Sequence, residues 1–208
     1  MRILLTGFEP FDGQPVNPSW AAVKQLPDFL ADAELCKAEL PTAFTAAEER
    51  MESLLAELQP DGVLCVGQAG GRAALTVEQV AINLRRASIP DNAGYQPDSE
   101  PVFPGGPDGL FAAWDVPGAV EAIRSAGIPA AVSYSAGTFV CNDLFYTLLR
   151  LRRERYPALQ GGFIHVPFLP EQAAHRSSPL PSAALSDIVK GLEAAAAFLI
   201  REICRPRP

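Results

Sequence analysis

A cysteine, a histidine and a glutamate stand where this sequence could place reactive groups. Cys141 follows the small-residue stretch SAGTFV and precedes a run typical of a helix. Backbone N–H groups and the dipole at a helix N-terminus favour a thiolate and can lower a cysteine pKa by about one unit or more. His165 follows the strand-like run GGFI and could serve as the base for that thiol. Glu78 lies within the apolar run LTVEQVAIN, where a buried carboxylate needs a partner and could orient the imidazole.

Each of these assignments has a competing interpretation. Free cysteines are commonly buried in cores, and a single histidine is more often structural than catalytic. Asp143 competes with Glu78 for the orienting role, although its position is typical of an acidic residue in the first turn of a helix. Ser135 in SYSAGT resembles the nucleophile of the GxSxG elbow, but Ser133 replaces the first glycine of that motif. His175 lies in the polar segment EQAAHRSS, which indicates a surface residue.

Short apolar runs, several of them closed by Gly or Pro, predict the strands that would carry these residues. The runs are RILLTG (2–7), AELCKAEL (33–40), DGVLCVG (61–67), AAVSYS (130–135) and GGFIHVP (161–167). LTVEQVAINL (75–84) has a mixed pattern, and we interpret it as a strand in a hairpin or at a sheet edge. The stretch 90–107 is rich in Pro, Gly, Asp and Asn and predicts a long loop.

Helical patterns alternate with these strands. In FTAAEERMESLLAEL (44–58) the apolar residues recur at helical spacing after a capping box from Thr45 to Glu48. The other predicted helices are 17–26, 116–127, the run after residue 141, and 181–204. The alternation predicts one α/β domain over residues 1–208, with a largely parallel sheet covered on both sides. Because ligands gather at the carboxyl ends of such strands, we expect Cys141 and His165 on the same side of the sheet.

Composition limits the classes of function. The chain has 208 residues, of which 48% are hydrophobic and 20% charged, as expected for a globular protein with one core. A net charge of -7 disfavours a nucleic-acid partner, and the arginines at 150–155 fall at the end of a predicted helix, where they complement its dipole. No apolar run approaches the roughly 18 residues that span a bilayer, and MRILLTGFEPFDG is too short for a signal peptide. We therefore expect a cytoplasmic protein without a membrane partner.

The cysteines and the glycine-rich segment bear on cofactors. The four cysteines are far apart and form no CxxC pair, so we expect reduced thiols. With two histidines and no tight spacing of His, Cys and carboxylates, we expect no metal. The segment VGQAGGRAAL could cradle a phosphate, although it fits neither GxGxxG nor GxxxxGK. A protein that binds a nucleoside or phosphate through this segment is therefore an alternative function.

Several segments together, in their order along the chain, resemble the pyroglutamyl peptidase I (pyrrolidone-carboxylate peptidase) family of cysteine exopeptidases. The segments are LLTGFEPFDG, VNPSW, VGQAGG, LTVEQVAINL, IPDNAGYQP, SAGTFVCN and FIHVPFLPEQ, and they are distributed over residues 4–172, most of the length of the chain. The resemblance implies an α/β/α sandwich with a twisted mixed sheet, no cofactor, and a homo-oligomer, often a tetramer. It also implies removal of an N-terminal pyroglutamate (5-oxoproline) from peptides by a triad of Cys141, His165 and Glu78.

The same resemblance implies a substrate pocket. The residues that would hold the lactam ring are Phe8, Phe11, Phe139 and Val140. The candidates for supporting polar contacts are Gln68 and Asn17. Each of the phenylalanines could instead belong to the core.

Two positions depart from the pattern of the family. Gln79 stands where a basic residue is common, and Ser88 stands where relatives carry an arginine before IPDN. If that arginine polarises the active site, Arg85 or Arg86 would have to substitute for it. An inactive relative that is kept as a thiol sensor is a further alternative.

Overall fold

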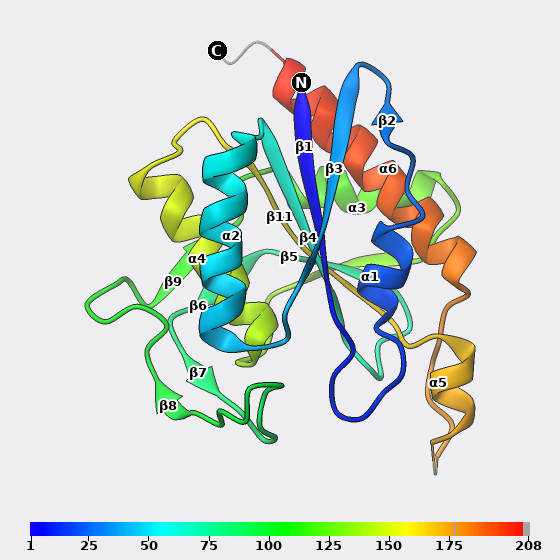
Figure 1. The fold of residues 1–208 in the computed structure, drawn as a ribbon. Coiled ribbons are helices and arrows are strands. Elements are labelled where there is room, and N and C mark those ends of the chain that lie inside the picture. Colours follow the sequence, from blue (N-terminus) through cyan, green and yellow to red (C-terminus); the bar gives the residue numbers. More distant parts are fainter. Residues whose placement is uncertain (177, 206–208) are drawn as a thin grey trace.

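A seven-stranded mixed sheet forms the centre of the molecule (Figure 1). The computed structural model describes residues 1–176 and 178–205. The sheet has the strand order β10-β5-β11-β4-β1-β3-β2. Its strands are β1 (Arg2–Phe8), β2 (Phe29–Leu30), β3 (Ala33–Leu40), β4 (Gly62–Gln68), β5 (Leu75–Glu78), β10 (Ala130–Ser133) and β11 (Gln160–Val166). All five strands predicted from short apolar runs are present, with bounds that differ by at most two residues.

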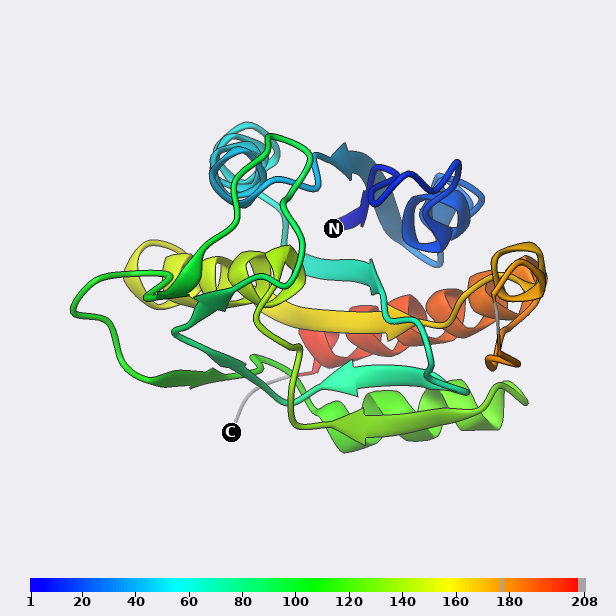
Figure 2. The same ribbon diagram turned by 90° about the horizontal axis from the view of Figure 1, so that it is seen from below.

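Helices cover both faces of this sheet, which confirms the α/β/α sandwich. The helices are α1 (Pro18–Val23), α2 (Phe44–Leu58), α3 (Val116–Ser125), α4 (Val140–Glu154), α5 (Pro170–Ala174) and α6 (Leu185–Cys204). Helices α2 and α4 lie on one face, and α1, α3 and α6 lie on the other (Figures 1 and 2). The short helix α5 was not predicted, and α1 is shorter than the predicted 17–26. None of the helices in the described part of the chain is long and apolar enough to cross a membrane.

The two faces of the sheet bury separate cores because side chains alternate along each strand. Ile3 and Leu5 of β1 belong to the core beneath α1, α3 and α6, whereas Leu4 and Phe8 belong to the core beneath α2 and α4. In β11, Phe163 packs in the second core, so His165, two residues further on, is directed to the same face. This alternation directs His165 toward the face that α4 covers.

The predicted capping box of α2 is wrong. The helix begins at Phe44, and its N-cap, Ala43, makes no side-chain hydrogen bond. The cap comes instead from a distant loop, because the Phe44 N–H donates to Oδ2 of Asp91 over 3.0 Å. A carboxylate here also complements the positive end of the helix dipole.

The interpretation of LTVEQVAINL as a hairpin or edge strand is also wrong in its first half. Strand β5 lies inside the main sheet, parallel to β10 and antiparallel to β11. The second half forms β6 (Val80–Ile82), which pairs outside the main sheet with β9 (Gly109–Phe111). The chain crosses from the main sheet to the β6–β9 pair at Gln79. The N–H of Gln79 donates to the Ser133 carbonyl in the main sheet, and its carbonyl accepts from the Ala112 N–H. The mixed pattern of this run therefore reflects two strands in different sheets.

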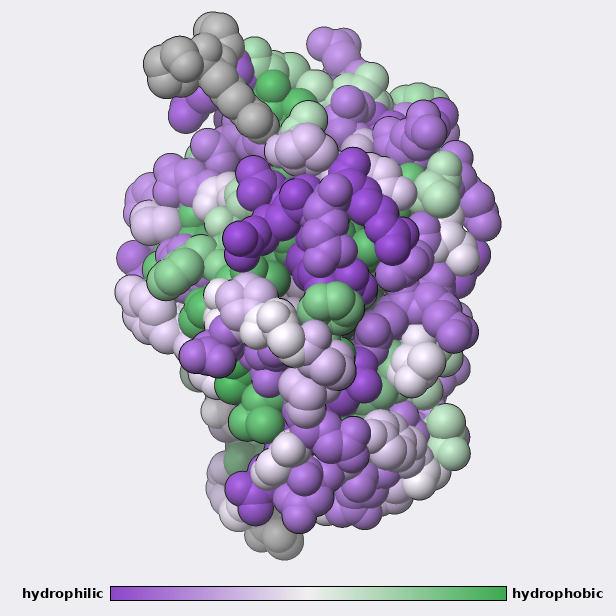
Figure 3. Space-filling view, turned by 90° about the vertical axis from the view of Figure 1, so that its left-hand side faces the viewer, coloured by the Kyte–Doolittle hydropathy of each residue, from purple (hydrophilic) through white to green (hydrophobic). Residues whose placement is uncertain are grey.

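The predicted loop 90–107 contains one short strand. Strand β8 (Asp98–Glu100) pairs with β7 (Arg85–Arg86), and Asp91 organises the preceding turn by accepting from the N–H groups of Ala93 and Tyr95. Figure 2 shows the segment from β6 to β9 beside α4. Figure 3, seen from that side of the molecule, shows a mainly hydrophilic surface with scattered hydrophobic residues.

Candidate active site

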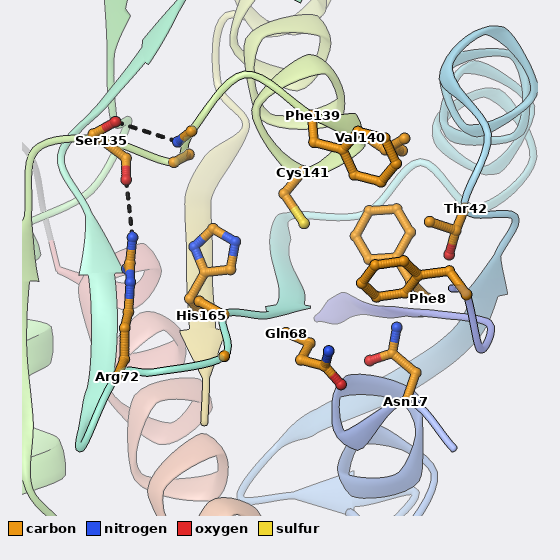
Figure 4. A pocket seen from close by; sticks show the side chains of 15 residues that line it. Phe8, Asn17, Thr42, Gln68, Arg72, Ser135, Phe139, Val140, Cys141 and His165 are labelled. Atoms are coloured by element: carbon orange, nitrogen blue, oxygen red, sulfur yellow. Dashed lines mark hydrogen bonds between the residues drawn. The ribbon is translucent and has the colours of Figure 1, made fainter. Parts of the chain in front are cut away.

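A pocket of about 420 Å³ lies where β1, β4 and β11 end, between the sheet and the N-terminus of α4. Predicted site residues that line it are Phe8, Phe11, Asn17, Gln68, Phe139, Val140, Cys141 and His165. The structure thus brings all of these together, and the remaining predicted residue, Glu78, lies directly behind His165. Lining residues that were not predicted include Thr42 and Arg72. Figure 4 shows the labelled side chains around this pocket.

His165 and Glu78 form a buried hydrogen-bonded pair. Nδ1 of His165 lies 2.7 Å from Oε1 of Glu78, and the two residues are 3% and 0% exposed. Burial works against the charge of Glu78, but the hydrogen bond and charge of His165 oppose it and hold the pKa of the carboxyl below its usual value. An ionised carboxylate only accepts, so Nδ1 carries the proton and Nε2 of the neutral ring is left as an acceptor. The pair therefore presents a base.

Arg72 is a third member of this group that the sequence did not predict. Its Nη1 lies 2.7 Å from Oε1 of Glu78, and its Nη2 donates to the Ser135 carbonyl over 3.0 Å (Figure 4). Arg72 follows β4 in the segment GQAGGR, where the sequence offers a weak phosphate motif and a family resemblance but no signal for Arg72 itself. Because its guanidinium is engaged with Glu78 and Ser135, the structure does not favour phosphate binding by this segment.

Cys141 stands in the first turn of α4, with its sulfur directed into the pocket (Figure 4). Gly67 of β4 makes room for it, because a Cβ at Gly67 would lie 2.7 Å from the Cys141 Sγ. The thiol and the His165 ring thus approach one pocket from the same face of the sheet. This arrangement permits the sulfur and the imidazole to act on one bound group.

The ionisation of the thiol differs from the expected lowering at a helix N-terminus. Burial raises the pKa of Cys141 to about 12, and the charge of Glu78 adds to this effect while Arg72 opposes it. Burial also lowers the pKa of His165, although its hydrogen bond to Glu78 and the charge of that carboxylate act in the opposite direction. Cys141 remains partly exposed to the pocket, which limits its desolvation. The raised pKa of the thiol and the lowered pKa of the imidazole both favour the neutral pair over a thiolate–imidazolium pair.

Cys141 and His165 meet by a different route from the one expected. Strand β10 is parallel to β5, which is antiparallel to β11, so β10 and β11 run in opposite directions. The chain after β10 returns to the pocket through residues 134–139. That segment is held by Arg72 at the Ser135 carbonyl and by the Arg86 N–H at the Thr138 carbonyl. The argument from the carboxyl ends of parallel strands is therefore wrong, although the pairing of the two residues is present.

Aromatic rings form one wall of the pocket. The ring centroids of Phe11 and Phe139 lie 6.1 Å apart, and Phe44 packs edge-on against Phe139 at 5.4 Å. Phe8 is 2% exposed and packs against Phe163 at 6.4 Å. Phe8 thus belongs both to the core and to the pocket wall.

The two predicted polar residues, Asn17 and Gln68, differ in how many hydrogen-bonding groups they leave available to a substrate. The amide oxygen of Asn17 accepts from the N–H and the hydroxyl of Ser19, and its nitrogen donates to the Glu9 carbonyl. Asn17 therefore caps α1 and supports the pocket wall with its amide largely engaged. Gln68 is held at one end only, where its Oε1 accepts from Gln172 over 3.0 Å.

The remaining candidates lie elsewhere. Asp143 is a first-turn residue of α4, as expected, but it is buried and paired at 2.5 Å with Arg85, which also pairs with Glu48. Arg86 is exposed, and neither arginine lines the pocket, so neither substitutes there for the arginine absent at Ser88.

The two weaker candidates, Ser135 and His175, lie in different surroundings. Ser135 lines the pocket, with its hydroxyl accepting from the Gly137 N–H. His175 is exposed at the end of α5, as predicted. Within residues 1–176 and 178–205, no group of three or more His, Cys, Asp or Glu side chains could hold a metal ion.

A thiol in the first turn of a helix, beside an imidazole–carboxylate pair in an α/β/α sandwich, is the arrangement of a cysteine peptidase. Comparison with known proteins agrees, since the family model described as pyroglutamyl peptidase matches residues 1–202. The chain belongs to the pyroglutamyl peptidase family.

Relatives match over nearly their whole length. The pyrrolidone-carboxylate peptidase of Thermococcus onnurineus is 50% identical over 193 residues, 93% of this chain and 96% of the relative. That of Levilactobacillus brevis is 50% identical over 196 residues, 94% and 95% of the two chains. The crystal structure of Bacillus amyloliquefaciens pyroglutamyl peptidase I superimposes with a TM-score of 0.94 at 45% identity, covering 97% of this chain and 98% of that one.

Proposed function

We propose that this protein hydrolyses the amide bond after an N-terminal pyroglutamate, with Cys141 as nucleophile, His165 as base and Glu78 as the group that orients the base. The observation that carries this proposal is the 2.7 Å contact between His165 Nδ1 and Glu78 Oε1, at a pocket that the Cys141 thiol also lines. That contact leaves Nε2 of His165 unprotonated and able to accept the thiol proton.

The reaction begins from the neutral pair. As the Cys141 sulfur attacks the carbonyl carbon, its proton passes to His165 Nε2, and the charge that develops on the carbonyl oxygen is stabilised by backbone N–H groups at the start of α4. Collapse of the tetrahedral intermediate breaks the C–N bond, and His165 returns the proton to the leaving amine. A water molecule activated by His165 then hydrolyses the thioester, which releases pyroglutamate and restores the thiol.

The pocket suits a neutral lactam better than a charged amine. Phe8, Phe11 and Phe139 offer aromatic surface to a small flat ring. Among the described residues that line the pocket none is acidic, and Arg72 carries a positive charge. A free N-terminal ammonium would therefore be desolvated without a counter-charge, so the pocket rejects unmodified N-termini.

Release of a chromophore from a pyroglutamyl amide tests the proposal. Wild type is expected to release it, whereas Cys141→Ala and His165→Ala are expected to be inactive. Cys204→Ala and His175→Ala remove the same side-chain types from exposed positions and serve as matched controls. Hydrolysis that persists in Cys141→Ala would exclude the thiol mechanism. A wild type without hydrolysis would favour the thiol-sensing alternative.

The assembly, the location and the partners are proposed on the resemblance and the composition alone. We propose a homo-oligomer, a tetramer as is frequent in the family, which acts in the cytoplasm as one domain without cofactor or metal. Light scattering coupled to size-exclusion chromatography tests the tetramer, and a monomer at working concentration would contradict it. We propose that peptides with an N-terminal pyroglutamate are the partners and that nucleic acids and membranes are not.

A further inference from the structure

Gln172 of α5 is a buried amide whose hydrogen bonds join three segments at the edge of the pocket. It is 8% exposed, and its Oε1 accepts from the Leu169 N–H over 3.0 Å. Its Nε2 donates to the Val16 carbonyl over 3.2 Å and to Oε1 of Gln68 over 3.0 Å. Helix α5, the loop before α1 and the end of β4 are therefore tied together by one side chain.

The orientation of the Gln172 amide follows from the chemistry of its partners. The Leu169 N–H can only donate, so the atom facing it must be the Gln172 oxygen. The Val16 carbonyl can only accept, so the atom facing it must be the Gln172 nitrogen. Both partners lie on the backbone and cannot exchange roles. The Gln172 nitrogen therefore also faces Gln68.

This orientation fixes the neighbouring amide. Because Gln172 presents an N–H, Gln68 must turn its oxygen toward Gln172 and its nitrogen away from it. Figure 4 shows the Gln68 nitrogen on the side of the pocket, beneath Phe8, and the oxygen on the opposite side. Gln68 therefore offers the pocket a hydrogen-bond donor and withholds its acceptor.

We infer that Gln172 is a positioning residue for substrate recognition, which holds Gln68 so that its Nε2 donates to the ring carbonyl of pyroglutamate. The inference rests on the proposed function and adds the atom that reads the lactam. The ring carbonyl is the group that distinguishes pyroglutamate from proline. Because Gln172 already holds the Gln68 side chain, Gln68 can bind this oxygen without the loss of conformational entropy that a mobile glutamine would undergo.

A double-mutant cycle between Gln68 and Gln172 tests the inference. In Gln68→Met and in Gln172→Met we expect KM for a pyroglutamyl amide to rise about tenfold, with kcat within about threefold of wild type. The inhibition constant of 2-pyrrolidone, the bare lactam ring, should rise by a similar factor. The double variant should resemble either single variant, because Gln172 acts on the lactam only through Gln68.

Gln172→Glu provides a second variant with a larger expected effect. An ionised carboxylate accepts only, so Gln68 would reverse its amide and present its oxygen to the lactam carbonyl. The rise in KM should then exceed that of Gln172→Met. Gln160→Met and Gln160→Glu make the same changes at the first residue of β11, outside the residues that line the pocket, and should leave the kinetics unchanged.

The outcomes separate this inference from the proposed function. The inference alone would be overturned if the losses added in the double variant. In that case Gln172→Met would lower kcat and thermal stability equally in wild type and in Gln68→Met, which would show that Gln172 only holds α5 in place. A wild type without activity on pyroglutamyl amides would overturn the proposed function and this inference with it.

Discussion

Arg72 and His165 share one oxygen of Glu78. Nη1 of Arg72 and Nδ1 of His165 each lie 2.7 Å from Oε1, and the Glu78 side chain is fully buried. The guanidinium supports the ionised carboxylate, and its positive charge lowers the pKa of His165 in addition to the lowering by burial. Arg72 is thus placed to keep the imidazole neutral while it anchors Ser135 on the way to the nucleophile.

Substitution of Arg72 should change the pH dependence of catalysis. His165 must be neutral to act as a base, and its pKa lies below the ordinary value of about 6.5 in the native protein. In Arg72→Met the pKa of His165 should rise, so the acid limb of the kcat/KM profile should move to higher pH. At pH 7 we expect kcat/KM to fall about 10- to 100-fold, because the Ser135 segment loses its anchor.

The measurement is the pH profile of kcat/KM from about pH 4 to 9 for wild type and Arg72→Met. Arg50→Met serves as the control, because Arg50 is exposed and its pair with Glu57, at 3.9 Å, is a long one. An acid limb at the same pH in wild type and Arg72→Met would show that Arg72 does not set the pKa of His165.

Alkylation should reveal the protonation state of the resting thiol. Because burial raises the pKa of Cys141 to about 12, the fraction of thiolate grows with pH throughout the accessible range. We expect the rate of Cys141 modification by iodoacetamide to rise with pH beyond pH 9 without a plateau near neutrality. Mass spectrometry of the Cys141 peptide separates this rate from those of the other three cysteines. A plateau between about pH 6 and 8 would indicate a thiolate–imidazolium pair instead.

The sequence predicts those features that depend on local pattern. Apolar runs locate β1, β4 and β11, since a strand buried on both faces is continuously hydrophobic. Strand β3 differs, because its buried residues are interrupted by exposed charged ones. Cys141, His165 and Glu78 stand out because each is a reactive or charged residue beside such a run, where burial requires a partner. Their assembly around one pocket does not follow from the strands alone, because β10 runs opposite to β11 and the chain returns to the pocket through residues 134–139.

The features that the sequence does not predict depend on contacts between distant segments. Nothing near Asp91 indicates that it caps α2, and nothing in LTVEQVAINL indicates that β5 runs antiparallel to β11. Arg72 and Gln172 act through partners on other segments, so neither has a local signal. The expected low pKa of Cys141 is wrong for the same reason, because desolvation depends on tertiary packing.

Replacement of Glu78 should impair the chemical step while leaving the nucleophile in place. In Glu78→Gln the amide can donate to Nδ1 of His165, which favours the tautomer with the proton on Nε2, where the base is needed. We expect kcat to fall about 10² to 10⁴-fold, by analogy with loss of the orienting carboxylate in serine proteases. Glu78→Ala should give a loss smaller than that of Cys141→Ala, because Glu78 orients and does not react.

Steady-state kinetics on a pyroglutamyl amide and thermal unfolding of each Glu78 variant provide the test. Thermal unfolding identifies any loss that comes from misfolding, which is a concern because Arg72 would lose its buried partner. Wild-type kcat in Glu78→Gln would remove the carboxylate from the mechanism.

Gly67 should be sensitive to the addition of a single methyl group. A Cβ at this position would lie 2.7 Å from the Cys141 sulfur and 2.8 Å from the Phe163 ring, so the thiol must move away from the sheet. In Gly67→Ala we expect a fall in kcat of about tenfold or more and a loss of about 1–3 kcal/mol in the free energy of unfolding. Gly109→Ala is the matched control, since its nearest atom would lie at 3.4 Å. Steady-state kinetics and denaturant unfolding of both variants provide the test. If Gly67→Ala had wild-type activity and stability, catalysis would not depend on the position of the Cys141 sulfur that Gly67 permits.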